Sequence, residues 1–375
     1  MSHKFHPTRL RDYEVHVPDI STLPTEKIHA AEPIDIMGRV PLSITHKSPV
    51  PPERKKKKWI GTTMRVLLTL LMFAVLFKSV SWSMLIQSLV HTQHGMLLVG
   101  LIVGFCGIVL SAYQWRSLLN VERITSDLAD LINLYIVGVA FSHFLPTGMG
   151  GDAIKALYVG RESGNSAGSA SAVLLCRIIG FFGMLLIALP TLLFWHDELD
   201  TKLVLAFIFL ALLVAGMILG ALLAVIFLPR FMRGRWSRHR FLAPVIKVGN
   251  AVSKTIQRPH TLLIANLYGM AFWLVAILNC YCYAEALRLE VPLYFYFFVV
   301  PLISLISFLP ISINGFGLRE TAFVYAFSTV HIASAPALLL ALLMDMQALS
   351  FAVVGGSIYL TMGEKLKAAR ERKVA

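Results

Sequence analysis

The sequence predicts an all-α polytopic membrane protein with about six spanning helices and two re-entrant helical hairpins in an inverted repeat. First, 57% of the 375 residues are hydrophobic and only 15% are charged, whereas soluble domains carry about 25% charged residues. Second, six apolar segments approach or exceed the length of a membrane span. Third, two further apolar segments end in proline- and glycine-rich breaks. The net charge of +13 comes from basic residues between these segments and at both ends, which is typical of a topology signal, so we expect no nucleic-acid partner.

The first 58 residues differ from the rest of the chain. They contain eight prolines, scattered charges and no apolar periodicity, and they end in the basic run 54–58. Such a segment cannot bury enough apolar surface to offset its ordering entropy, so we expect a disordered tail. The predicted organisation is a cytoplasmic N-terminal tail, a transmembrane domain in two repeat halves, and a basic cytoplasmic C-terminal tail: residues 1–58, 59–362 (halves about 59–200 and 201–362) and 363–375.

Six apolar segments are predicted to span the membrane. About 20 residues at 1.5 Å per residue cross a hydrocarbon core of about 30 Å. The predicted spans are residues 62–77, 96–113, 170–195, 203–228, 261–287 and 335–360.

Two further apolar segments are interrupted. Residues 128–145 run into the sequence Pro-Thr-Gly-Met-Gly-Gly-Asp at 146–152, and residues 291–309 run into Pro-Ile-Ser-Ile-Asn-Gly-Phe-Gly at 310–317. Proline and glycine end a helix at such points. A short second helix is predicted after each break, over residues 153–159 and 318–330.

The two breaks share a pattern. Counted from the proline that starts each break, a glycine follows after five residues and a basic residue after nine: Gly151 and Lys155 in the first, Gly315 and Arg319 in the second. This repeat suggests two halves of related structure.

The distribution of lysine and arginine predicts the topology. Residues 229–258 hold eight basic residues, so this loop and both basic termini are placed in the cytoplasm, whereas the loops 81–94 and 191–202 face outside. This assignment requires that each broken segment leaves the membrane on the side from which it enters. The two hairpins are therefore expected to enter the membrane from opposite sides. The membrane is expected to be a plasma (bacterial inner) membrane.

Two inverted halves that each contain a discontinuous helix are the plan of many secondary transporters, with the substrate site between the halves. Irregular backbone persists at membrane depth only where it is buried in protein or lines a cavity. We therefore expect 146–152 and 310–317 to approach each other near mid-membrane and to line one polar cavity. The alternative is a pair of proline-kinked helices without a substrate role.

These motifs resemble a known family. The stretch from Phe144 to Asp152, the following Arg177, and the stretch from Asn314 to Glu320 are similar to the lysylphosphatidylglycerol synthase transmembrane family, over about residues 59–362. The resemblance implies a lipid translocator that acts on aminoacylated phosphatidylglycerol, prenyl-linked sugars or related lipids. Similar proteins often carry an arginine in the last span, where this chain has Asp345. We expect a stand-alone member that lacks the soluble aminoacyl-transferase domain.

Arg177 and Arg319 are the leading candidates for binding a lipid phosphate. A guanidinium stays charged at depth and can bind phosphate with two hydrogen bonds. Arg319 also begins a helix after a glycine-rich break, where free backbone N–H groups favour an anion. The full set of candidate substrate-binding residues is Arg177, Arg319, Asp152, Glu320, Asn314, Asp345, Gly150, Gly151, Gly315 and Gly317.

Several of the charged residues in the first half have a second, structural interpretation. Arg177 could reach the cytoplasmic surface with its long side chain, and Asp152 could be the N-cap of the helix that it begins rather than a group for substrate or proton coupling. Lys155 is interpreted as an interfacial anchor, and His143 as a packing histidine.

The acidic residues of the second half have similar alternatives. Glu320 is either a first-turn residue that matches the helix dipole or an ion-pair partner of Arg319. Asp345, in the last span, is expected either to pair with an arginine such as Arg177 or Arg319 or to be protonated.

The sequence therefore favours a translocator of a phospholipid or lipid-linked substrate. The alternative is a non-transporting membrane subunit that anchors a lipid-modifying enzyme or a glycosyltransferase, which could dock on the basic residues of 229–258. The spacing reveals no nucleophile with a base, no metal-ligand cluster and no paired carboxylates, so we expect neither an enzyme nor a cofactor or metal. The expected partners are membrane lipids.

Overall fold

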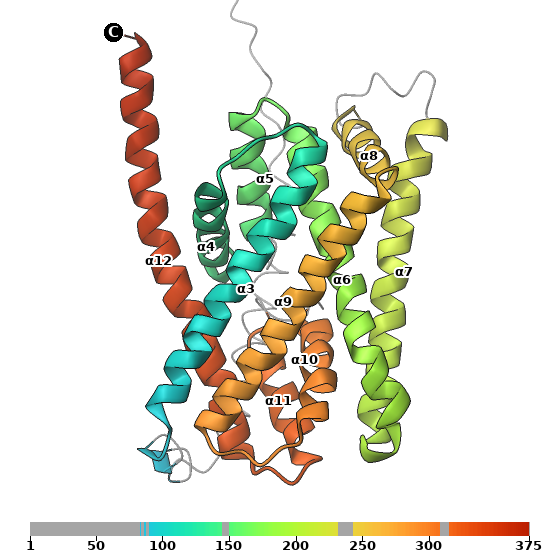
Figure 1. The fold of residues 1–375 in the computed structure, drawn as a ribbon, viewed down its shortest axis with the longest axis vertical. Helices are drawn as coiled ribbons and strands as arrows, with labels where there is room; N and C mark the ends of the chain where they lie inside the picture. The colour runs from blue at the N-terminus through green and yellow to red at the C-terminus, as the bar shows by residue number, and fades with distance from the viewer. Residues whose placement is uncertain are drawn as a thin grey trace, which may run out of the picture. The chain divides into compact units, whose positions relative to one another are not determined.

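The computed structural model describes Ser83, Ile86, Gln87 and residues 90–144, 150–231, 243–307 and 315–374, which are helical apart from short connections (Figure 1). No strand occurs within these ranges. The chain divides into two compact units, Met1–Pro52 and Glu53–Ala375, and all described residues belong to the second. The predicted tail and the first predicted span, 62–77, lie outside the described residues.

Within the part of the chain that the structure describes, five helices are long and apolar enough to cross a membrane, and they coincide with five of the six predicted spans. They are α3 (His94–Val121), α6 (Ser166–Phe194), α7 (Thr201–Phe231), α9 (Pro259–Ala286) and α12 (Ser334–Val374). Many of their large apolar side chains point outward, such as Phe209 and Leu212 on α7. Exposed apolar surface on this scale fits contact with lipid, so the prediction of an all-α polytopic membrane protein is confirmed.

The two interrupted segments form two short helical pairs. The first pair is α4 (Leu128–Phe144) and α5 (Gly150–Glu162), and the second is α10 (Leu293–Ser307) and α11 (Leu318–Ser328). The helices of each pair pack against each other. In Figure 1 the first pair lies in the upper half, where α3 ends and α6 begins, and the second lies in the lower half, where α9 ends and α12 begins. Each pair thus returns to the end from which it started, as expected for hairpins in opposite orientation.

Glycines shape both breaks, either by adopting backbone conformations that are strained for other residues or by allowing two helices to pack closely. Gly315 and Gly317 have φ angles of 81° and 80°, in the left-handed region that favours glycine. A Cβ on Gly151 would run into the carbonyl oxygen of Gly138 on α4. Because Gly151 has no side chain, α5 can pack closely on α4.

The α9 helix packs most extensively against α3 and also contacts α6, α10 and α12. A polar network ties three of these helices together. Asn279 Nδ2 on α9 donates to Gln347 Oε1 on α12 over 2.8 Å, and Gln347 Nε2 donates to the Gly100 carbonyl of α3 over 2.9 Å. A Cβ on Gly104 would occupy the place of the Gln347 amide. Glycine on α3 thus makes room for a buried amide between helices, a common device in membranes.

Two segments are more helical than predicted. Within the basic loop 229–258, residues Ala243–Ile256 form α8, which packs on α6 and α7, and Lys254 forms an ion pair with Glu122 at 3.2 Å. The last helix, α12, continues to Val374, so most of the predicted C-terminal tail extends the last span as a helix.

Candidate functional site

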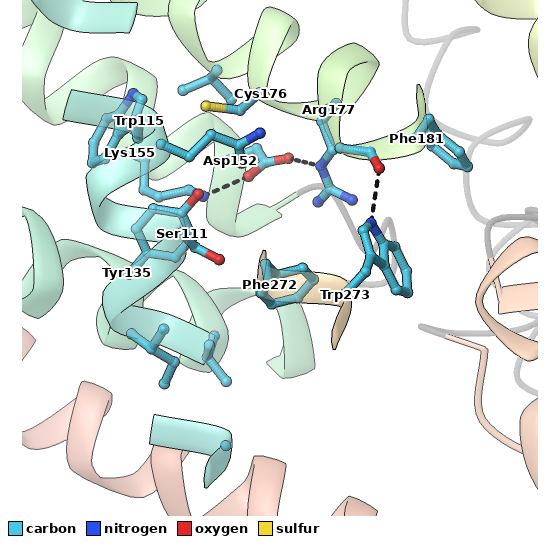
Figure 2. A pocket seen from close by; sticks show the side chains of 16 residues that line it. Ser111, Trp115, Tyr135, Asp152, Lys155, Cys176, Arg177, Phe181, Phe272 and Trp273 are labelled. Atoms are coloured by element: carbon cyan, nitrogen blue, oxygen red, sulfur yellow. Dashed lines mark hydrogen bonds and ion pairs between the residues drawn. The ribbon is translucent and has the colours of Figure 1, made fainter. Parts of the chain in front are cut away.

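A cavity of about 320 Å³ opens among α3, α4, α5, α6 and α9. Its charged lining residues are Asp152 and Lys155, both on α5, and Arg177 on α6 (Figure 2). The hairpin and the helix that follows it therefore bring together two of the predicted site residues and one residue that the sequence suggested for another role.

Asp152 joins the two cations of this cavity. Its Oδ1 lies 2.8 Å from Lys155 Nζ, and its Oδ2 accepts a hydrogen bond of 2.5 Å from Arg177 Nε. The N-cap interpretation of Asp152 is wrong, because α5 begins at Gly150 and both carboxylate oxygens are used by side chains. The residue instead holds an ion-paired triad, Lys155–Asp152–Arg177, which we call the α5–α6 triad.

Lys155 is buried rather than anchored at the interface, so that interpretation is also wrong. Its side chain is 8% exposed, and Nζ lies 3.7 Å from the centre of the Tyr135 ring and 5.7 Å from that of Trp115. Aromatic faces attract a desolvated ammonium. The spacing of three residues from Asp152 places both side chains on one face of α5.

Arg177 lies deeper than its predicted helix implied. Because α6 begins at Ser166, four residues before the predicted start, Arg177 is eleven residues into the helix (177 − 166), about 16 Å from its beginning. The side chain is 40% exposed, pairs with Asp152 and lines the cavity, and whether it also reaches the cytoplasmic surface stays a prediction. The guanidinium thus combines a fixed position with access to the cavity.

The remaining wall of the cavity is largely aromatic and apolar, with a few polar groups. Trp273 on α9 donates from Nε1 to the Gly180 carbonyl over 2.8 Å, which fixes the indole beside Arg177, as Figure 2 shows. Phe272 and Phe181 extend the apolar surface, and Ser111 lies near the triad. A few polar groups in a mostly apolar cavity are typical of a ligand site.

A second cluster of charges occupies the corresponding place in the second half. Arg319 on α11 pairs with Asp345 on α12, and its Nε lies 4.0 Å from Oε1 of Glu320. Glu320 Oε2 accepts a hydrogen bond of 2.5 Å from the Gly317 backbone N–H. Of the alternatives for Asp345, the structure selects pairing with Arg319. We call Glu320, Arg319 and Asp345 the α11–α12 triad.

The ends of the two breaks lie close together. The rings of His143, in the last turn of α4, and Phe316, between Gly315 and Gly317, are 6.0 Å apart. His143 Nδ1 also donates to the Val139 carbonyl over 3.0 Å, which agrees with a packing role. Asn314 and the break residues 145–149 and 308–314 lie outside the described residues. Arg319 is not among the residues that line the cavity, so a single cavity facing both arginines stays a prediction.

Gly150 and Gly151 are buried in the first turn of α5, and the N–H of Gly151 donates to Ser142 Oγ over 3.3 Å. Gly315 accepts from the Arg319 N–H through its carbonyl over 2.8 Å. These glycines, with Gly317, shape the hairpins that position both triads. Within the described ranges, no group of three or more His, Cys, Asp or Glu side chains could hold a metal ion.

Sequence reasoning missed the aromatic residues that surround Lys155, because Tyr135 and Trp115 lie on different helices and carry no local motif. The signal that could have revealed Lys155 itself was its position one turn after Asp152. Such spacing puts an acid and a base on one helical face, and this pairing favours burial of both.

A comparison with known proteins agrees with the geometry. The family model described as "Lysylphosphatidylglycerol synthase TM region" matches residues 63–356, which includes every described transmembrane helix apart from the end of α12. No curated protein and no solved structure is significantly similar to the chain. The match covers both hairpins, both triads and the helices between them, and the chain is a multi-pass membrane protein that belongs to the lysylphosphatidylglycerol synthase TM family.

Proposed function

We propose that this protein moves a phosphate-bearing lipid across the bilayer and that the α5–α6 triad binds the phosphate. The observation that carries the proposal is the charge of the cavity lining. Lys155 and Arg177 bring two positive charges and Asp152 one negative charge, a surplus of one positive charge at membrane depth. A phosphodiester carries one negative charge, so its binding would make the site neutral.

A translocator needs such a site because an unpaired ion is costly in hydrocarbon. A phosphate cannot cross a core of about 30 Å unless fixed donors replace its water. Arg177 supplies a planar fork for two phosphate oxygens, and the partly exposed side chain can turn from Asp152 to a ligand. Lys155, held by Asp152 and the Tyr135 ring, supplies a second charge without the entropy cost of ordering a free side chain.

The apolar parts of the cavity suit the rest of a lipid. Phe181 and Phe272 border the guanidinium side of the cavity, so acyl chains could remain in contact with apolar surface while the phosphate meets the triad. Arg319, which the sequence suggested as a second phosphate ligand, pairs with Asp345. We therefore assign the first contact with the phosphate to Arg177 and Lys155, and a phosphate contact at Arg319 stays a prediction.

The test is leaflet exchange in liposomes that contain the purified protein and a fluorescent phosphatidylglycerol. Arg177→Gln should lose about 1.5–3 kcal/mol of charge-assisted hydrogen bonding, which is roughly a 10- to 150-fold slower exchange. Arg177→Lys should be intermediate, because the charge survives and the fork does not. Arg161→Gln, at the exposed end of α5, is the matched control and should exchange at the wild-type rate.

The results also separate the alternatives. Wild-type exchange in Arg177→Gln, at equal amounts of folded protein, would contradict the site assignment. Absence of exchange by the wild-type protein for phosphatidylglycerol and for a prenyl-phosphate lipid would contradict translocation. The same absence of exchange would favour a non-transporting subunit that anchors a lipid-modifying enzyme.

A further inference from the structure

The two triads have the same construction and opposite charge. In each, the second helix of a hairpin carries two charged residues and the next helix supplies the third: Lys155 and Asp152 with Arg177, and Arg319 and Glu320 with Asp345. The first triad has two bases and one acid, whereas the second has two acids and one base. If all groups are ionised, the α11–α12 triad therefore carries a surplus negative charge.

This surplus charge lies deep in the membrane domain. Asp345 is eleven residues after the start of α12 (345 − 334), about 16 Å along the helix. Glu320 is 0% exposed, and the side chains of Arg319 and Asp345 are 27% and 14% exposed. An uncompensated charge at this depth costs several kcal/mol. A positive charge is therefore required to balance the triad.

We infer that the α11–α12 triad is a proton-binding site, with Oε1 of Glu320 as the acceptor, and that lipid translocation is linked to the proton that it binds. The link between this proton and translocation rests on the proposed function, whereas the proton site does not.

The contacts with Arg319 favour this oxygen over those of Asp345. Oδ1 of Asp345 is in direct contact with Arg319, which stabilises the ionised form of that carboxylate, although its Oδ2 is also buried without a hydrogen bond from the described residues. Oε2 of Glu320 accepts the Gly317 N–H. Oε1 of Glu320 is buried, accepts no hydrogen bond from the described residues, and lies 4.0 Å from Arg319 Nε. In the step itself, a hydronium ion gives its proton to Oε1, an O–H bond forms, and one water molecule remains. The triad changes from one negative charge to neutral, and the hydrogen bond that begins α11 stays intact.

Other titratable groups near the triad do not supply the balancing charge. Cys280 on α9 lies within electrostatic reach of Arg319. Tyr296 on α10 packs against Phe327 of α11 with ring centres 6.0 Å apart. Thiol and phenol groups are ordinarily neutral at neutral pH. His143 on α4, whose ring packs on Phe316, has its Nδ1 hydrogen-bonded to the Val139 carbonyl. Of the charged groups in the described part of the chain, Glu320, Arg319 and Asp345 are the ones in contact within this cluster, so they set its charge.

The size of the site favours a proton over a larger cation. Glu320 has no accessible surface, so an organic amine cannot reach its carboxylate. A metal ion takes several oxygen ligands, and no suitable group of three acidic, His or Cys side chains occurs among the described residues. A proton needs only one oxygen and a chain of water or a neighbouring carboxylate.

The test combines infrared spectroscopy with transport in the reconstituted protein. Acidification should produce the carbonyl band of a buried carboxylic acid in the wild type and not in Glu320→Gln. Glutamine can accept the Gly317 N–H as glutamate does, so this variant should fold. Asp345→Asn is the second variant. It leaves Arg319 and Glu320 as a neutral pair and should also abolish the band. Glu290→Gln, at an exposed site, is the matched control and should retain it.

Transport gives the second measurement. Wild-type exchange should change with pH by up to about tenfold per unit, the limit for one linked proton, and should respond to an imposed pH gradient. In Glu320→Gln the rate should be independent of pH. A band that persists in Glu320→Gln would overturn Glu320 as the proton acceptor, and a band that persists in Asp345→Asn would overturn the requirement for a surplus negative charge. A pH-dependent rate in Glu320→Gln would overturn the coupling. A correct pattern of bands without any lipid exchange would support the proton site and contradict the proposed function instead.

Discussion

Replacing Asp152 with asparagine would remove the charge that joins Lys155 to Arg177 and would nearly preserve the shape of the side chain. Both carboxylate oxygens are in use, at 2.8 Å from Lys155 Nζ and 2.5 Å from Arg177 Nε. Removing one partner of a buried ion pair costs about 3–5 kcal/mol, because a charge is left uncompensated. Arg177 is 40% exposed and can turn to water, so its share is small. The buried Lys155 carries most of the cost, and we expect a loss of about 3 kcal/mol in the free energy of unfolding.

A double variant tests whether the stranded ammonium is the cause. Lys155→Met alone leaves the Asp152–Arg177 pair in place. In combination with Asp152→Asn it removes the uncompensated charge, so the double variant should be more stable than Asp152→Asn alone. Partners in one ion-pair network typically show a coupling energy of about 0.5–3 kcal/mol. Unfolding of the purified protein by titration with a denaturing detergent would measure all four free energies. Purely additive effects would refute the reasoning, as would wild-type stability of Asp152→Asn.

Two other predictions concern packing and topology. Gly151→Ala should strongly reduce the thermal stability of the protein, because the new Cβ would meet the α4 backbone. In the control Gly216→Ala on α7, nothing lies within 4 Å of the added atom, so this change should be neutral or stabilising by up to about 1 kcal/mol. Equal melting temperatures of the two variants would contradict the proposed contact. A cysteine introduced at Arg240, in the basic segment 229–258, should react with a membrane-impermeant thiol reagent only from the cytoplasmic side, and labelling from outside in intact cells would overturn the predicted orientation.

The fold could be predicted largely because the membrane restricts it. A segment that crosses about 30 Å of hydrocarbon must be long, apolar and helical. Five predicted spans therefore coincide in position with observed helices, namely α3, α6, α7, α9 and α12. The breaks were identifiable because proline and glycine interrupt helices locally. The ends of helices were less predictable. Charged residues after position 360 gave no reason to extend α12, although its helix continues to Val374.

The candidate site was predicted residue by residue but not as a set of contacts. Arg177 and Asp152 are 25 residues apart in the chain (177 − 152), and their pairing depends on the packing of α5 against α6. Asp345 had two possible partners in the sequence, and the packing of α11 on α12 selects Arg319. Lys155 was misinterpreted because sequence position alone gives no depth within a re-entrant hairpin. Local patterns therefore identify the charged residues, whereas tertiary packing determines which charges meet.

The amide network of Gln347 and Asn279 limits how this protein can move. It links α3 of the first half to α9 and α12 of the second half, so the halves cannot rock as independent rigid bodies without breaking it. Each buried hydrogen bond that is lost costs about 1–3 kcal/mol when its partner stays dry. The three long helices thus act as a fixed frame that crosses the repeat boundary. If the protein moves lipid as proposed, displacement of the short hairpins α4–α5 and α10–α11 against this frame is the movement that would leave the network intact.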